Sequence, residues 1–264
     1  MTKPSDSLVR RDPWQALRSR TPARIALGRA GGSLPSEEVL RFGLAHARAR
    51  DAVHCALDED ALARELGEAG FLHYRARSMA ADRGTYLKRP DLGRRLDEDD
   101  RLALERAPPA AELAIVIADG LSAIAIQCHA LPLLQALRRR FAADWARTPV
   151  VIARQGRVAL GDDIGEALRA TLVAVLIGER PGLSSPDSLG VYLTYAPRRG
   201  RMDSERNCLS NIRPEGLGYE AAAHKLAYLL QAALRLRLSG VSLKEDAATA
   251  ALPEVRHPDG RDGG

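Results

Sequence analysis

The stretch "VAVLIGERPGLSSPDSLG", which runs from Val173 to Gly190, decides how this chain folds. It begins as an unbroken apolar run and then breaks into Gly-Glu-Arg-Pro-Gly. A short apolar run that ends in glycine and proline is typical of a buried strand followed by a turn. Such turns often hold phosphates, but neither GxGxxG nor GxxxxGK(S/T) occurs in the chain. The carboxylate of Glu179, at the end of the strand, therefore needs another explanation.

Two earlier segments repeat this pattern. "LAIVIADG" (113–120) and "PVVIARQG" (149–156) are apolar runs that end in polar, glycine-bearing turns. Helical patterns follow over residues 121–143, 162–170 and 219–240. Strands that alternate with helices favour βαβ units, so we expect an α/β fold with a Rossmann-like, mostly parallel sheet flanked by helices. "VYLTYAP" (191–197) alternates in polarity and predicts an edge strand.

The chain before residue 109 has a different character. Residues 1–32 are irregular and rich in arginine, with Trp14 as their large apolar side chain. Helices are predicted from Pro35, over residues 58–69 and from near Asp97. We therefore predict three parts, which are an N-terminal arm and mainly helical domain (1–108), an α/β domain (109–243) and a disordered polar tail (244–264).

Composition excludes several classes of protein. The chain has 264 residues and 45% hydrophobic residues, as expected for a globular protein of about two domains. Its net charge of +5 comes from arginines that alternate with acidic residues, which argues against a nucleic-acid partner. Cys55, Cys128 and Cys208 are widely spaced, so we expect neither a zinc site nor disulfides, and a reducing cytoplasm. No signal peptide or membrane span is evident.

The candidate site follows from the strand order. In an open parallel sheet, ligands lie beyond the carboxyl ends of the strands. Three polar turns end the predicted strands, and a polar segment with Cys208 follows them; the four stretches are 118–123, 153–163, 178–185 and 207–216. We expect the three turns to lie on one edge of the sheet and to bind something polar and large. Glu179 is placed to accept hydrogen bonds there.

Each candidate residue also has a structural interpretation. Asp119 is placed to cap the helix that follows it. Glu179 and the arginine after it fit an ordinary surface ion pair. Cys208 fits a small buried apolar residue, since no partner for a nucleophile is evident. His46 and His54 are eight positions apart and can share a helix face, although such a pair is more often structural than metal-binding.

Six segments together carry a family resemblance. They are "TPARIALGRAG" (21–31), "RPDLGRRL" (89–96), "IADGLSA" (117–123), "GRVALGDDIGE" (156–166), "GERPGLSSPDSLGVYLTYAPR" (178–198) and "RNCLSNIRPEG" (206–216). In this order they closely resemble the small (light) subunit of ethanolamine ammonia-lyase. The resemblance covers roughly residues 12–244.

The resemblance implies a function for the chain. Enzymes of this family are carbon–nitrogen lyases that convert ethanolamine to acetaldehyde and ammonia by a radical mechanism, with adenosylcobalamin as cofactor. A large subunit, a TIM barrel, holds the substrate and most catalytic groups, and six large–small pairs assemble. The small subunit covers the cobalamin at the interface, is inactive alone and carries no catalytic residue. Its cobalamin contacts fall, motif by motif, on Val158, Glu179 and Cys208.

Two absences bear on this interpretation. The chain has no Asp-x-His-x-x-Gly, since "DAVH" (51–54) has the wrong spacing. This agrees with the family's habit of keeping the cofactor's own base on cobalt. Only about a dozen residues precede the family segment, without a clear targeting extension, so we expect the cytoplasm and keep a bacterial microcompartment as an alternative. The alternatives are a stand-alone α/β nucleotide- or small-ligand-binding protein, and a purely structural scaffold for the large subunit.

Overall fold

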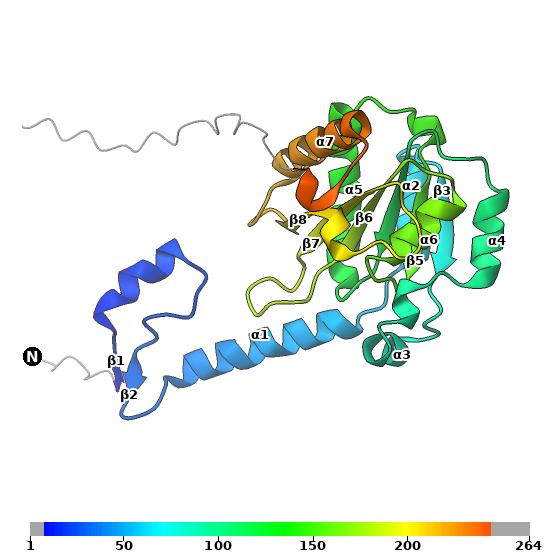
Figure 1. The fold of residues 1–264 in the computed structure, drawn as a ribbon. Coiled ribbons are helices and arrows are strands. Elements are labelled where there is room, and N and C mark those ends of the chain that lie inside the picture. Colours follow the sequence, from blue (N-terminus) through cyan, green and yellow to red (C-terminus); the bar gives the residue numbers. More distant parts are fainter. Residues whose placement is uncertain (1–7, 244–264) are drawn as a thin grey trace, which may run out of the picture.

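A six-stranded sheet organises the protein. The structure, a computed structural model, describes residues 8–243 and is shown in Figure 1. The strand order is β3-β5-β4-β6-β7-β8. The strands are β3 (His73–Arg77), β4 (Leu113–Ala118), β5 (Val150–Arg154), β6 (Leu172–Gly178), β7 (Leu189–Tyr195) and β8 (Arg206–Ile212). β3, β5, β4 and β6 run parallel, β7 runs antiparallel to them, and β8 pairs antiparallel with β7, which confirms the predicted α/β class with a mostly parallel sheet.

Helices cover both faces of the parallel part. On one face α5 (Ala123–Arg140) and α7 (Tyr219–Leu236) pack against each other and share a core with α2 (Glu59–Glu68). On the other face α6 (Leu160–Ala167) packs against β6 and against α4 (Glu98–Arg106). All residues of β4 and β6 are buried, as expected for strands covered on both faces, and this explains their continuous apolar runs.

The remaining elements lie mostly before β4. They are the helices α1 (Ser36–His54) and α3 (Arg83–Lys88), the two-residue strands β1 (Val9–Arg10) and β2 (Arg29–Ala30), and the 3₁₀ turns η1 (Pro13–Arg20), η2 (Leu92–Arg94), η3 (Trp145–Arg147), η4 (Asp203–Glu205) and η5 (Gly240–Ser242). The predicted helix starts at residues 35, 58 and 97 are confirmed within one residue. α1 extends away from the body and leads to the β1–β2 pair (Figure 1).

Two strands differ from expectation. The prediction that residues 191–197 form an edge strand is wrong, because β7 lies between β6 and β8. The edge strand on that side is β8, most of which falls in the segment 207–216 that sequence analysis treated only as a polar stretch. Its exposed side chains are polar because no helix covers them, so the apolar signal of a strand is weak.

β3 is a second strand that the sequence did not indicate. It lies before residue 108 but pairs in parallel with β5, which lies after it. The division at residue 108 thus stays a prediction, and the predicted tail 244–264 lies outside the described residues.

A buried ion pair fastens the edge strand β8 to α6. The Arg206 guanidinium donates to both carboxylate oxygens of Asp162, over 2.7 and 2.6 Å, and to the Thr194 hydroxyl over 2.9 Å. Both charged side chains are almost fully buried. Burial raises the pKa of Asp162, and the hydrogen bonds from Arg206 oppose that shift. Loss of either partner would leave an uncompensated buried charge.

We predict that Arg206→Ala lowers the free energy of unfolding by about 3–5 kcal/mol, because Asp162 is then left unpaired. Urea denaturation of the full chain measures this change. Arg89→Ala is the matched control, since Arg89 makes an exposed ion pair of 2.6 Å with Asp91 and should change stability little. Equal effects of the two substitutions would show that the buried pair does not hold β8 in place.

Candidate functional site

The turns after three parallel strands meet at one edge of the sheet. Gly120 after β4, Val158 after β5 and Glu179 after β6 line the same hollow of about 280 Å³. We call this the edge hollow; its other lining residues are Tyr86, Leu121, Arg157, Ile177, Gly178, Arg180 and Tyr192. The expectation that the three turns share one edge is therefore confirmed.

Two glycines allow these turns to touch. Gly120 has a φ of +57°, and a β-carbon added to it would lie 2.3 Å from the carbonyl oxygen of Gly178. A β-carbon on Gly178 would lie 2.1 Å from the carbonyl oxygen of Ser122. The amide of Leu121 donates to the Gly178 carbonyl over 2.8 Å. Any side chain at either glycine would separate the two turns.

Asp119 links the turns after β4 and β5. Its buried carboxylate accepts a hydrogen bond from the Gly156 amide (3.1 Å) and lies 3.7 Å from the guanidinium of Arg83. Burial raises its pKa, against the effect of these partners. The interpretation of Asp119 as the cap of the following helix is wrong, because the Ser122 hydroxyl caps α5 at the amide of Ala125.

Glu179 pins the edge strand β8 to the end of β6. Its carboxylate accepts hydrogen bonds from the Ser188 hydroxyl, from the Ser210 hydroxyl over 2.5 Å and from the Asn211 amide over 3.2 Å. Within residues 8–243 it forms no ion pair with Arg180, so the surface-pair interpretation is wrong. The carboxylate that follows β6 thus joins two strands that are not neighbours in the sheet.

Cys208 lies beside the edge hollow. It is opposite Tyr192 in the β7–β8 ladder, and opposite residues of antiparallel strands point to the same side. Because Tyr192 lines the hollow, Cys208 shares its face of the sheet. The cysteine is exposed, so its interpretation as a buried apolar residue is wrong. Partial burial of the thiol raises its pKa, as does the nearby Glu179, and a raised pKa favours the neutral thiol.

Sequence analysis did not single out Tyr86 or Arg157, which also line the hollow, although Arg157 lies within the predicted turn 153–163. Tyr86 is fully buried, and the guanidinium groups of Arg83 and Arg157 lie 4.8 and 4.2 Å from the centre of its ring. Burial raises the pKa of Tyr86 to about 12, so the phenol is neutral. Tyr86 lies on the short helix α3, where no sequence motif marks it as a site residue.

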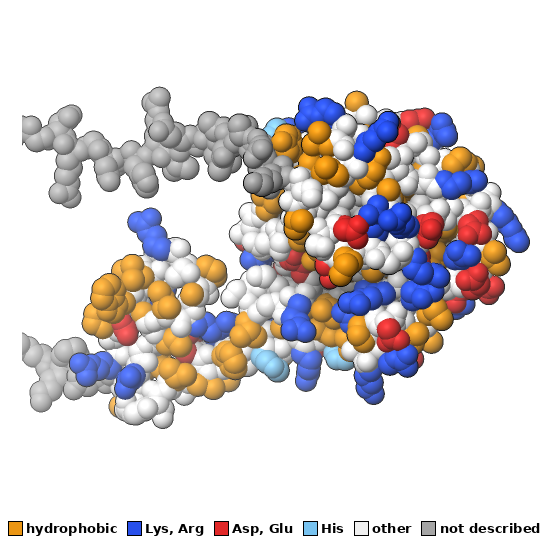
Figure 2. Space-filling view, in the orientation of Figure 1, with side chains coloured by type: hydrophobic (Ala, Val, Ile, Leu, Met, Phe, Trp, Pro, Cys, Tyr) orange, Lys and Arg blue, Asp and Glu red, His pale blue; other side chains and the backbone are white. Residues whose placement is uncertain are grey.

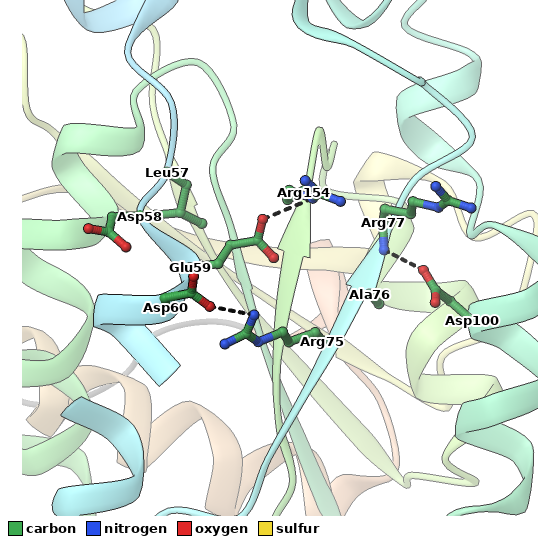
Figure 3. Close-up of a pocket in the computed structure, with 9 residues that line it drawn as sticks. All are labelled: Leu57, Asp58, Glu59, Asp60, Arg75, Ala76, Arg77, Asp100 and Arg154. Carbon is green, nitrogen blue, oxygen red and sulfur yellow. Dashed lines mark hydrogen bonds and ion pairs between the residues drawn. The ribbon is translucent and has the colours of Figure 1, made fainter. Parts of the chain in front are cut away.

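A second hollow, at the carboxyl ends of β3 and β5, has a volume of about 540 Å³ (Figure 3). Each of its charged side chains already has a partner within the chain. The contacts are Arg154 Nε to Glu59 (2.9 Å), Arg75 to Asp60 (2.7 Å) and the Arg77 amide to Asp100 (2.8 Å). Because these charges are already paired, the second hollow is a weaker candidate for a ligand than the edge hollow.

Between residues 8 and 243, no cluster of three or more His, Cys, Asp or Glu is placed to hold a metal ion. His46 and His54 both lie on α1. The three cysteines are free. None of the helices described is long and apolar enough to cross a membrane.

The fold and the edge hollow define an open α/β protein whose loops meet at the carboxyl edge of a mostly parallel sheet, where this class binds ligands. The sequence model of the family Ethanolamine ammonia-lyase light chain (EutC) matches residues 11–244. Over 246 residues the chain is 56% identical to the ethanolamine ammonia-lyase small subunit of Azotobacter vinelandii, with 91% of each chain covered. It thus belongs to the ethanolamine ammonia-lyase light chain family.

Relatives in other organisms agree. The small subunit of Pseudomonas putida is 54% identical over 246 residues, which cover 91% of this chain and 90% of that one. The small subunit of Ralstonia nicotianae is 53% identical over 253 residues, with 94% of each chain covered.

We predict that Glu179→Ala accelerates amide hydrogen exchange at Asn211 and lowers the free energy of unfolding by about 1–3 kcal/mol, because three donors lose their acceptor. Exchange read by mass spectrometry on peptides of β8 tests the local effect. Glu68→Ala, on the exposed surface of α2, is the control and should leave β8 unchanged. Unchanged exchange in Glu179→Ala would contradict the link between β6 and β8.

Proposed function

We propose that this chain is the small subunit of an adenosylcobalamin-dependent ethanolamine ammonia-lyase. It works with a large catalytic subunit, in six large–small pairs, and contributes part of the cobalamin site at their interface. The cytoplasm is its proposed location. The observation that carries the subunit role is the uncovered helix α1.

α1 has almost no core of its own. It is 19 residues long, and Ala52 is its one buried residue. Apolar side chains stand in solvent along it, namely Val39 (52% exposed), Leu40 (73%), Phe42 (48%) and Leu44 (53%). Figure 2 shows hydrophobic side chains gathered over α1 and the segment that precedes it. Because helices in proteins are stabilised by packing an apolar face, α1 needs a partner surface.

The edge hollow suits a corrinoid held by this chain on one side. Val158 is half-buried there and offers apolar contact. Glu179 has about four acceptor positions, three of them taken, which leaves one for an amide of the ligand. Cys208 offers a neutral, polarizable surface beside them. When bound, adenosylcobalamin supplies the radical chemistry, and these residues orient it and exclude water.

A purely structural scaffold is the second candidate. The observation that favours it is that the carboxylate of Glu179 already binds Ser188, Ser210 and Asn211. On that view the cobalamin contacts are incidental. The stand-alone ligand-binding alternative is less favoured, because it leaves the exposed apolar face of α1 unexplained.

We predict that co-expression with the large subunit yields adenosylcobalamin-dependent release of ammonia from ethanolamine, while either subunit alone is inactive. The assay is coupled ammonia release with and without added cofactor. Full activity of the large subunit alone would overturn the proposal.

We predict that Leu40→Asp weakens association with the large subunit by about tenfold or more, because it places a charge on the apolar face of α1. Association is measured by co-purification and analytical ultracentrifugation. Arg106→Asp, on the exposed end of α4, is the control and should leave association intact. An intact complex with Leu40→Asp would show that α1 does not meet the large subunit.

We predict that Val158→Asp and Cys208→Ser raise the KM for adenosylcobalamin without dissociating the complex. A charge beside the corrin should raise the KM by about tenfold, and the smaller change at Cys208 by less. Steady-state kinetics on the purified complex distinguishes cobalamin binding from a purely structural role. Unchanged KM values for adenosylcobalamin would favour the scaffold.

A further inference from the structure

A third hollow continues from the edge hollow. It has a volume of about 690 Å³, and Arg157 and Val158 line both hollows. Five arginines line it, which are Arg94, Arg95, Arg157, Arg199 and Arg201. We call it the arginine groove. A ligand seated over Val158 therefore reaches directly into a strongly basic surface.

The carboxylates of the groove are already paired. Asp162 is bound by the buried Arg206 beneath the groove. Asp163 accepts hydrogen bonds from Arg199 (3.1 Å) and from the amide of Leu96 (3.1 Å). The third carboxylate, Asp203, is exposed and lies 3.5 Å from Arg206. These acidic groups are thus offset by cations within the fold.

Within the described residues, Arg157 and Arg94 have no carboxylate partner, so both can pair with a bound anion. The side chain of Arg157 donates to the carbonyl of Tyr86 (3.2 Å) and stacks on its ring, but pairs with no carboxylate in the described residues. The Arg157 amide is also held, by the carbonyl of Gly93 over 2.8 Å. Arg94 is exposed, and its side chain has no hydrogen bond or ion pair within residues 8–243. One guanidinium is thus fixed in place and the other is free to close on a ligand.

We propose that the arginine groove binds the phosphodiester of the cofactor's nucleotide loop, and that Arg157 and Arg94 are the residues that contact it. This inference rests on the proposed function. Guanidinium groups match phosphate oxygens in a two-point geometry and stay charged at all working pH values. Cobalamins carry one phosphodiester between a corrin side chain and the base. Contact of the corrin with Val158 places that anion within reach of the groove.

Three corrinoids test this assignment on the purified complex with the large subunit. Cyanocobalamin has the phosphodiester and the base, cobinamide phosphate keeps only a phosphate, and dicyanocobinamide has neither. Dissociation constants come from equilibrium dialysis, which needs no turnover. Arg157→Gln and Arg94→Gln should each weaken the binding of cyanocobalamin and of cobinamide phosphate by about tenfold, which is the loss expected for one charge-assisted hydrogen bond. The dissociation constant of dicyanocobinamide should stay unchanged. Arg106→Gln is the matched control and should change none of the three.

The outcomes separate the possibilities. Equal weakening of all three corrinoids, or no weakening, would overturn the phosphodiester assignment while leaving the proposed function standing. Failure of the unsubstituted complex to bind any corrinoid would overturn the proposed function itself. Dissociation of the large subunit from a folded Arg94→Gln variant would instead assign the groove to an acidic surface of that subunit. Because Arg157 packs on Tyr86, circular dichroism should confirm that Arg157→Gln is folded. Arg94→Gln is a second control for misfolding, since the Arg94 side chain is exposed and forms no hydrogen bond or ion pair within the described residues.

Discussion

The backbone contact between Gly120 and Gly178 is the constraint on which the site depends. β4 and β6 are parallel neighbours, so their turns leave the sheet at the same edge and must pass each other there. The carbonyl oxygen of Gly178 lies only 2.3 Å from the position that a β-carbon on Gly120 would take, so the absence of a side chain lets the turns pass in direct contact. With β6 ending at Gly178, the next residue, Glu179, reaches sideways to Ser210 and Asn211 of β8. The shape of the edge hollow follows from that crossing.

Two polar interactions then hold the edge strand β8 in place, on the side of the sheet where no helix covers one of its faces. Glu179 fixes β8 near its carboxyl end, and the buried pair of Arg206 with Asp162 fixes its beginning. Cys208 lies on β8 between these two points, exposed on the face of Tyr192. An apolar cover would make these links unnecessary, but it would also close the surface. The open face and the unburied α1 both support the proposed association with another subunit.

The net charge of +5 has a different meaning in three dimensions than in the sequence. Many arginines are bound to carboxylates or carbonyls of the same chain, as Arg154 is in the second hollow (Figure 3). Arg94 and Arg157 are without a carboxylate partner in the described residues, and both line the groove next to Val158. Local excess of charge, rather than the total, therefore indicates where an anion is favoured.

The sequence by itself determined the alternation of strands and helices, and with it the edge on which Gly120, Val158 and Glu179 would meet. It did so because strands buried on both faces must be continuously apolar and parallel strands must end at one edge. Family motifs added Cys208. Only the tertiary structure decided that β8 is a strand, that Glu179 binds it, and that Tyr86 and Arg157 complete the hollow. These contacts join residues far apart in the chain, so no local pattern predicts them. A half-exposed edge strand and a short helix also lack the hydrophobic periodicity by which an element is recognised in a sequence.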